Sequence, residues 1–512
     1  MPGRTPLSLE DNTPLDKGAV DVRARCGWVV RMVRLTAPGA PTLKQLAEAA
    51  GTNSARLHRL ETGALRDGAL LDACEEALGA ETGSVRAAVD VTCRTFPADS
   101  PPDTRPGSPA TGVRAVSDLT EALLDAADAG EVIAAGAWLR WSRAMAAAGA
   151  VGLPERLARP LVDRLVDELG RSVGPGYPVR YESLALLRSG PYGHLVVDAA
   201  RAVVAEPDVQ RVADLVSAVS EAVTADAVAL AVDLLADDRV RVAEAGALAV
   251  ENLAAVGPDP AGLWAQLVPS LVDAYVAGCD DPVRWEWLSH LLRLAPVALL
   301  RPHQARLPRP PAPKAAISDW SASRANAYWS TCEDLARRVC AEASVTYQPM
   351  VVRLLFDVAM SHHETRGVTS YMLVGAVPAL VGPVADAVAE IAETHDDEVV
   401  RARAARRLRG ALWGVLPARA EGWVDGPDPV LDATGLALAG AAGTRLDPAA
   451  YDDALADPAH RTAALFGLGM AGHPHLALLA ADRPAGAGAG AVDPEVAGAA
   501  RWWCRHGARV VR

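Results

Sequence analysis

The 512-residue sequence has few of the features that mark a secreted, metal-binding or membrane-spanning protein. Its seven cysteines are odd in number and contain no Cys-x-x-Cys spacing, which argues against a disulfide framework and against a zinc site. No run of 18 apolar residues is free of charged, glycine or proline interruptions, so no membrane span is expected. The first 20 residues lack the apolar stretch of a signal peptide. We therefore expect a cytoplasmic protein without metal or cofactor.

Aromatic residues and lysine are also scarce. Only 4% of the residues are aromatic although 50% are hydrophobic, so the core must consist mainly of Ala, Val and Leu, the small-residue mixture of closely packed helices. Of the 50 basic residues, only Lys17, Lys44 and Lys314 are lysines. With 63 acidic residues the net charge is −13, which excludes a uniformly basic nucleic-acid-binding protein. Any DNA-binding surface must therefore be local.

Helical periodicity runs through most of the chain and is interrupted by proline-rich stretches. Residues 95–112 (TFPADSPPDTRPGSPATG) contain five prolines and no apolar periodicity, which predicts a linker. We expect the chain to consist of a disordered leader (1–20), a compact helical domain (21–94), the linker (95–112), a helical block (113–300), a Pro-rich loop (301–316) and a second helical block (317–512).

One sequence phrase recurs in the two helical blocks. It begins with a turn containing Asp or Pro, continues with Val and often Arg, and then places Ala and Leu at helical spacing. Clear copies are DDRVRVAEAGALAV (237–250), DDPVRWEWLSHLL (280–292) and DDEVVRARAARRL (396–408). The Asp can cap a helix N-terminus, and Pro suits the first helical turn. The phrase resembles the second helix of HEAT repeats, which implies a long α-solenoid in an all-α protein; another helical repeat or a bundle is the alternative.

Residues 42–63 (TLKQLAEAAGTNSARLHRLETG) carry the most informative pattern. A first short helix containing Leu46 is expected to end at Gly51, because glycine readily adopts the positive φ of a helix C-terminus. Asn53 is a favourable N-cap for a second helix, in which Leu57 faces inward. Two short helices joined by a glycine-containing turn form a helix-turn-helix.

This stretch resembles the helix-turn-helix of the XRE family, the phage-repressor and Cro type. The matching residues are Leu46-Ala47, Gly51, Leu57 and Leu60-Glu61-x-Gly63. The segment CGWVVRMVRL (26–35) resembles the first helix of that family, and LLDACEEALGAETGSV (70–85) resembles a later one. The resemblance covers residues 22–94 and implies a small N-terminal DNA-binding domain.

The resemblance implies a recognition helix that begins at Ser54. By position, Ser54, Ala55 and Arg59 would face base edges, where Arg59 could contact guanine in a bidentate manner. Arg56 and His58 would face the DNA backbone or flanking bases. The complete set of candidate DNA-binding residues is Lys44, Asn53, Ser54, Ala55, Arg56, His58 and Arg59. The alternative for Arg56 and Arg59 is an ordinary solvated helix face.

Charge and pairing support this interpretation. Residues 21–66 contain eight basic and three acidic residues, a local net charge of +5 within an acidic chain. Such a basic face can bind phosphates. In the XRE family the residue at Glu61 often pairs with an arginine of the first helix. We therefore expect Glu61 to pair with Arg31 or Arg34 and not to contact DNA.

The expected function is a nucleoid-associated transcriptional regulator that binds double-stranded DNA at two operator half-sites as a homodimer. The helical array would dimerise and sense a peptide, a protein or a small molecule. One alternative is a protein-interaction scaffold built on the repeats. A HEAT-like DNA-repair enzyme is less favoured, because the array is acidic, and we do not expect an enzyme. The sequence contains neither a Walker phosphate loop nor a GxSxG motif.

Overall fold

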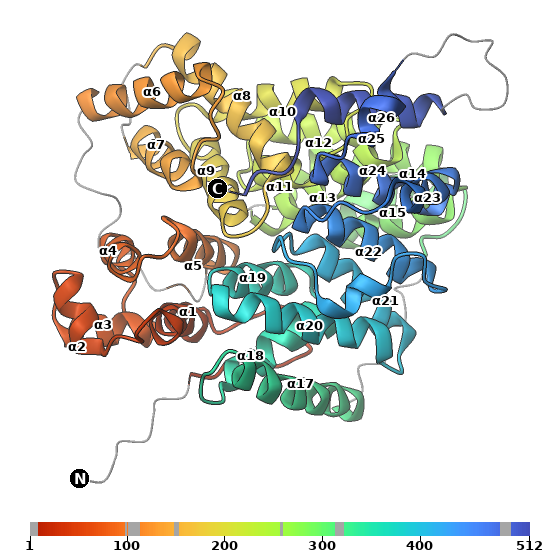
Figure 1. Cartoon of the computed structure of the whole chain (residues 1–512). Helices are drawn as coiled ribbons and strands as arrows, with labels where there is room; N and C mark the ends of the chain where they lie inside the picture. Colours follow the sequence, from red (N-terminus) through yellow and green to blue (C-terminus); the bar gives the residue numbers. More distant parts are fainter. Residues whose placement is uncertain are drawn as a thin grey trace.

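Helices form almost all of the described structure, a computed structural model of the chain (Figure 1). It describes residues 9–97, 100, 113–147, 153–256, 260–312, 322–481 and 493–511. Within these ranges there is no β-strand, and an isolated β-bridge links Ser172 to Val510. The predicted all-α class is confirmed, and neighbouring helices pack on one another as in a solenoid.

The N-terminal domain contains five helices. They are α1 (Val22–Thr36), α2 (Leu43–Ala49), α3 (Ser54–Glu61), α4 (Gly68–Leu78) and α5 (Ser84–Thr95).

The first helical block runs from α6 to the 3₁₀ helix η2. Its elements are α6 (Val113–Asp128), α7 (Ala135–Ala147), α8 (Glu155–Arg171), α9 (Gly176–Arg188), α10 (Gly193–Ala205), α11 (Ala213–Ser220), α12 (Ala225–Leu235), α13 (Val240–Val256), α14 (Pro260–Gly278), α15 (Pro282–Leu294), α16 (Val297–Leu300) and η2 (Arg301–Arg306). Residues 301–306, expected to be a loop, therefore form a short helix.

The second block runs from α17 to the C-terminal helix. Its elements are α17 (Ala322–Glu342), α18 (Pro349–Leu355), the π-helix η4 (Phe356–Met360), α19 (Glu364–Gly375), α20 (Pro378–Thr394), α21 (Glu398–Gly410), the 3₁₀ helix η5 (Ala418–Gly422), α22 (Pro429–Ala442), α23 (Pro448–Ala456), α24 (Pro458–Ala471), α25 (His475–Ala480) and α26 (Pro494–His506).

The recurring aspartates begin several of these helices, as the sequence phrase predicted. The side chains of Asp397, Asp428, Asp457 and Asp493 each accept a hydrogen bond from a backbone N–H in the first turn of the following helix. These N–H groups have no partner within the helix, so the carboxylates satisfy them and complement the helix dipole.

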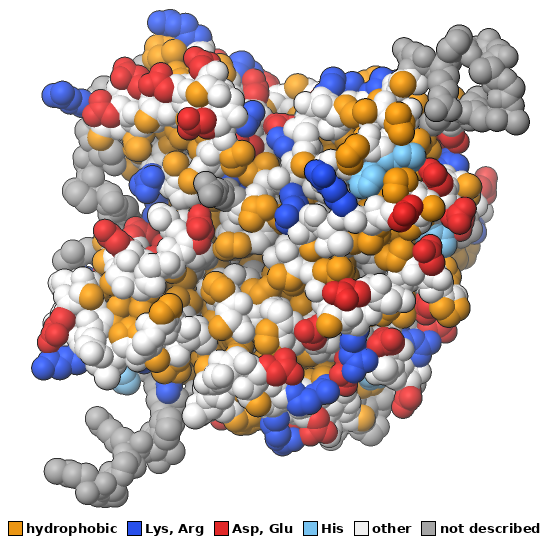
Figure 2. All heavy atoms as spheres, viewed as in Figure 1, with side chains coloured by type: hydrophobic (Ala, Val, Ile, Leu, Met, Phe, Trp, Pro, Cys, Tyr) orange, Lys and Arg blue, Asp and Glu red, His pale blue; other side chains and the backbone are white. Residues whose placement is uncertain are grey.

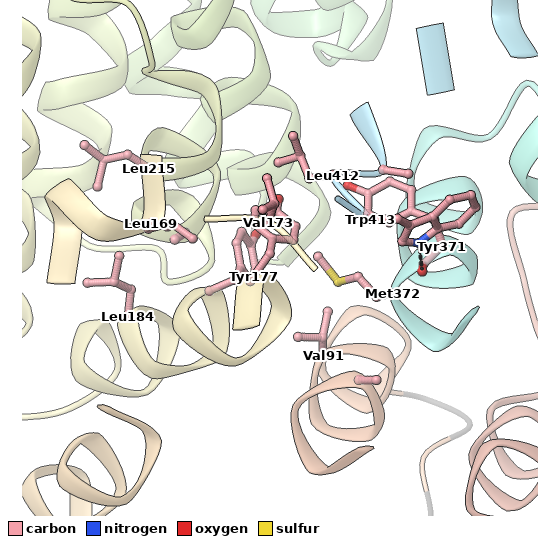
Figure 3. Packing of buried hydrophobic residues seen from close by; sticks show 14 of the residues in the cluster. Val91, Leu169, Val173, Tyr177, Leu184, Leu215, Tyr371, Met372, Leu412 and Trp413 are labelled. Carbon is pink, nitrogen blue, oxygen red and sulfur yellow. Dashed lines mark hydrogen bonds between the residues drawn. The ribbon is translucent and has the colours of Figure 1, made fainter. Parts of the chain in front are cut away.

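The two blocks meet and close the array on itself. The backbone N–H of Val173, after α8, donates to the carbonyl of Val510 at 2.9 Å, and the N–H of Gly174 donates to the carbonyl of Leu412 at 2.7 Å. Figure 3 shows the buried cluster at this junction, where Val173 and Tyr177 of the first block lie near Trp413 of the second. The C-terminal segment thus returns to the first block (Figure 1).

Residues 9–20 correct one expectation. We expected a disordered leader at 1–20, but Asp11 is buried and its carboxylate accepts a hydrogen bond from Arg25 at 2.6 Å. Arg353 of α18 also donates to the carbonyl of Thr13 at 2.6 Å. Long-range arginine contacts therefore order this segment. Residues 1–8, 313–316 and most of the predicted linker at 95–112 lie outside the described residues.

Candidate nucleic-acid interface

Helices α2 and α3 form the predicted helix-turn-helix, with a cap at each start. Thr42 and Gln45 form a capping box, in which the Thr42 N–H donates to the Gln45 side chain at 2.8 Å and the Thr42 hydroxyl accepts from the Gln45 N–H at 3.3 Å. Gly51 has a φ of +63° in the turn. The Asn53 side chain accepts from the Arg56 N–H at 2.9 Å, which confirms the predicted N-cap.

The two faces of α3 differ in exposure. Leu57 and Leu60 are buried in the core of the domain, while Ala55, His58 and Arg59 are exposed and Ser54 is half-buried. Helix α3 lies with α2 at the edge of the molecule, away from the array (Figure 1). The outward face therefore presents most of the residues that the sequence placed toward DNA. Asn53, at the start of α3, is also exposed.

The contact between Arg34 and Glu61 holds α1 against the end of α3. Arg34 Nε donates to Glu61 Oε1 at 2.6 Å and Arg34 Nη2 donates to Oε2 at 2.9 Å, a bidentate pair in which both side chains are buried. Arg34 also donates to the carbonyl of Pro41 at 3.0 Å. The predicted structural role of Glu61 is confirmed, and the pair fixes α3 and the α1–α2 loop together.

Arg56 and Lys44 differ in how far their charges are available. Arg56 pairs with the buried carboxylate of Asp67, which also caps α4 by accepting from the Leu70 N–H at 3.1 Å. Its side chain is 35% exposed, so part of its charge is used inside the domain. Lys44 on α2 is 80% exposed, and its ammonium lies 3.7 Å from Glu48 on the same helix. Such an exposed pair is weak, and water or a phosphate can compete for the lysine.

Helix α5 fastens this domain to both blocks of the array. It packs against α9 of the first block and α19 of the second. Arg94, at its C-terminal end, pairs with Glu182 at 2.5 Å and also with Glu221. Contacts on both sides of α5 set the direction in which α3 points relative to the array.

A buried ionic cluster, which the sequence did not suggest, adds a second connection. It comprises Asp11, Arg25 of α1, Arg353 of α18, Asp357 of η4 and Arg366 of α19, all of them buried. Arg25 pairs with both carboxylates, and Arg353 and Arg366 also pair with Asp357. Burial alone would raise the pKa of Asp357, but the three arginines outweigh it and hold that pKa below its ordinary value. The carboxylate is therefore charged at neutral pH.

The array is mixed in charge on the face drawn in Figure 2, in contrast to a DNA-binding groove. Figure 2 shows basic and acidic side chains interspersed over the face that it presents.

The described residues contain no group of three or more His, Cys, Asp or Glu side chains arranged to hold a metal ion. Within the same ranges, none of the helices combines the length and apolar character that a bilayer-spanning segment requires.

Comparisons with known proteins add no relative. No family model matches the chain, and neither a curated protein nor a solved structure shows a significant match to it. Functional interpretation therefore depends on the arrangement of the residues described above.

Proposed function

We propose that the protein is a sequence-specific DNA-binding transcriptional regulator that inserts α3 into the major groove. The observation that carries this proposal is the outward face of α3, where Ala55, His58 and Arg59 are exposed beyond a helix seated on the core through Leu57 and Leu60. An α-helix presented in this way fits the width of the major groove. The local net charge of +5 over residues 21–66 supports attraction to phosphates.

The exposed residues then have distinct roles. Arg59 reads a guanine through two hydrogen bonds, and the Ala55 methyl group contacts a thymine methyl. Lys44 binds a phosphate from the neighbouring helix. Arg56 supports this surface through Asp67 as well as contributing charge. Asn53, Ser54 and His58 border the same face and add contacts to the backbone or to flanking bases.

The array supplies dimerisation and effector sensing in this proposal. A single helix-turn-helix binds weakly, so two copies would contact half-sites about 34–36 Å apart on one face of the DNA. The rigid attachment of α5 to both blocks supports such a role, because a movement of either block would shift the recognition helix. Because the proposed function is DNA binding, we also propose that the protein is cytoplasmic and nucleoid-associated.

The test is selection of bound fragments from the source genome, followed by measurement of affinity for the enriched site. Arg59→Ala should weaken binding about tenfold to hundredfold. Arg337→Ala provides the matched control, because Arg337 on α17 is also an exposed helical arginine, with a side chain 58% exposed. The proposal is overturned if no fragment is enriched, or if the two variants weaken binding equally.

A further inference from the structure

Two cysteines of the N-terminal domain lie in direct contact. Cys26 of α1 and Cys93 of α5 have their Sγ atoms 3.8 Å apart, and the residues are only 7% and 3% exposed. All seven cysteines belong to the described residues, and this is the single thiol–thiol contact recorded among them. A disulfide bond requires an Sγ–Sγ distance of about 2.05 Å, so the sulfur atoms must approach by less than 2 Å.

Both cysteines lie next to an arginine that connects the domain to the array. Arg25 precedes Cys26 and pairs with Asp357, and Arg94 follows Cys93 and pairs with Glu182 at 2.5 Å. The backbone on either side of the thiol pair is therefore held by the array. We expect closure of the sulfur–sulfur gap to draw α1 and α5 together at this point and to disturb these arginine contacts.

A neighbouring contact transmits such a change to the recognition helix. Gly27, next to Cys26, packs so closely on the end of α3 that an added Cβ would lie 2.5 Å from the Gly63 amide nitrogen. Arg34, two turns further along α1, holds Glu61 of α3. A displacement of α1 at Cys26 therefore reaches α3 through backbone contact.

We propose that Cys26 and Cys93 form a redox-modification site, at which a hydroperoxide converts the two thiols into a disulfide that shifts α3 and weakens DNA binding. The effect on DNA depends on the proposed function, whereas formation of the disulfide and the shift of α3 do not. The oxidant is a small molecule such as hydrogen peroxide, because the core around the two thiols excludes a larger one.

The chemistry needs no reagent beyond the peroxide. The Cys93 thiolate attacks one peroxide oxygen, the O–O bond breaks, and Cys93 becomes a sulfenic acid while the other oxygen leaves as water after taking up a proton. The Cys26 sulfur then attacks the sulfenic sulfur, the S–O bond breaks, and a second water leaves. Two thiols are oxidised and one peroxide is reduced.

The order of attack follows from the environment of the two thiols. The hydrogen bond with Cys26, which outweighs burial and is assisted by the charge of Arg66, lowers the pKa of Cys93 to about 7. The same hydrogen bond, together with burial, raises the pKa of Cys26 well above its ordinary value. We assign Cys93 as the attacking thiolate and Cys26 as the resolving thiol, and the two alanine variants below test this order.

The experiment treats the reduced full-length protein with hydrogen peroxide under native conditions. We expect intact mass to show the loss of two hydrogen atoms, peptide mapping to show a Cys26–Cys93 link, and hydrogen exchange to change in residues 54–61. Affinity for an enriched DNA site should fall about fivefold or more and recover with a thiol reductant. Cys504→Ser, at an exposed cysteine, should respond like the wild type.

Two further variants identify the attacking thiol. Cys26→Ala should stop at a Cys93 sulfenic acid, which intact mass shows as a gain of one oxygen atom and peptide mapping places at position 93, and Cys93→Ala should gain no oxygen at position 26. Absence of the Cys26–Cys93 link in the folded protein overturns this inference, as does unchanged exchange of α3 after the link has formed. If the reduced protein binds no DNA, the proposed function fails, while the mass and exchange measurements still decide the redox site.

Discussion

Arg25 donates a hydrogen bond to Asp357, a residue 332 positions later in the chain, and both side chains are fully buried. The same guanidinium donates to Asp11 at 2.6 Å and to Ser370 at 2.9 Å. One side chain of α1 thus joins the N-terminal segment to η4 and α19. This cluster holds the N-terminal domain on the array as part of a single core.

The cluster predicts a large effect of Asp357→Asn. The substitution leaves three buried arginines facing one remaining carboxylate, and breaking a buried charge pair from one side typically costs about 3–5 kcal/mol. Urea denaturation should show this loss in the free energy of unfolding. Asp334→Asn is the matched control, because that carboxylate is 75% exposed and pairs with Arg337 at the surface, so less than about 1 kcal/mol is expected. Equal losses would contradict a structural role for the cluster.

Alanine variants of two glycines in the helix-turn-helix distinguish the stability cost of backbone strain from that of close packing. Gly51 and Gly63 have nearly equal φ values of +63° and +67°. An added Cβ would meet nothing within 4 Å at Gly51, whereas at Gly63 it would lie 1.9 Å from the Arg23 carbonyl oxygen. Gly51→Ala should therefore cost only the left-handed backbone strain, about 1–2 kcal/mol.

Gly63→Ala should cost about 3 kcal/mol or more, because the backbone of α1 must move away from the end of α3. Thermal unfolding, followed by circular dichroism, compares the two variants directly. A similar loss of stability in both variants would mean that the contact between Gly63 and Arg23 adapts freely, contrary to the packing described here.

Much of the helix-turn-helix could be predicted because its signals are local. The Asn53 cap and the turn glycine at Gly51 depend on residues within one helical turn, and the burial of Leu57 follows from helical periodicity. The pairing of Glu61 with an arginine of α1 was expected from family resemblance, and Arg34 is the residue that makes it. These features define the surface on which the proposed function depends.

The closure of the array and the buried ionic cluster could not be predicted in this way. Asp11 stands among polar and proline residues, and its partner Arg353 follows 342 positions later, so neither local sequence marks a buried ion pair. Likewise, the bridge between Ser172 and Val510 depends on the sum of many small rotations between successive helices of the array. Hydrophobic periodicity identifies the buried face of each helix but not its distant partner.

Lys44 and Arg59 should affect DNA binding in different ways. Lys44→Ala removes a phosphate contact, so affinity should fall similarly for all sequences, and the slope of log affinity against log salt should decrease in magnitude by about 0.9. Arg59→Ala removes a base contact, so the preference for guanine at one position should be lost. Titrations at several salt concentrations with the enriched site and its single-base variants measure both effects. A reversal of the two patterns would contradict the docking of α3 proposed here.

His506 predicts a pH-dependent contact between the C-terminal helix and the first block. Its Nδ1 lies 2.6 Å from Asp167 of α8, and its Nε2 lies 3.1 Å from Glu206, which follows α10. Arg171 also pairs with Asp167 at 2.6 Å, and Trp502 stacks on the imidazole with ring centroids 4.2 Å apart. Arg505 pairs with Glu206 at 3.3 Å, so the histidine faces two carboxylates, each of which also binds an arginine.

Burial acts to lower the pKa of His506, but the hydrogen bonds and charges of Asp167 and Glu206 outweigh it, so the pKa is raised above 6.5. A raised pKa in the folded state means that the protonated histidine stabilises the fold below the unfolded-state pKa of about 6.5, and that this stabilisation is lost as the pH rises through the folded-state value. His506→Gln should therefore lower the melting temperature more at about pH 6 than at about pH 9. The comparison with wild type at each pH cancels the contributions of other histidines, such as His395, whose pKa is lowered. An equal decrease at both pH values would show that His506 stabilises the fold by packing alone and not through its charge interactions with Asp167 and Glu206.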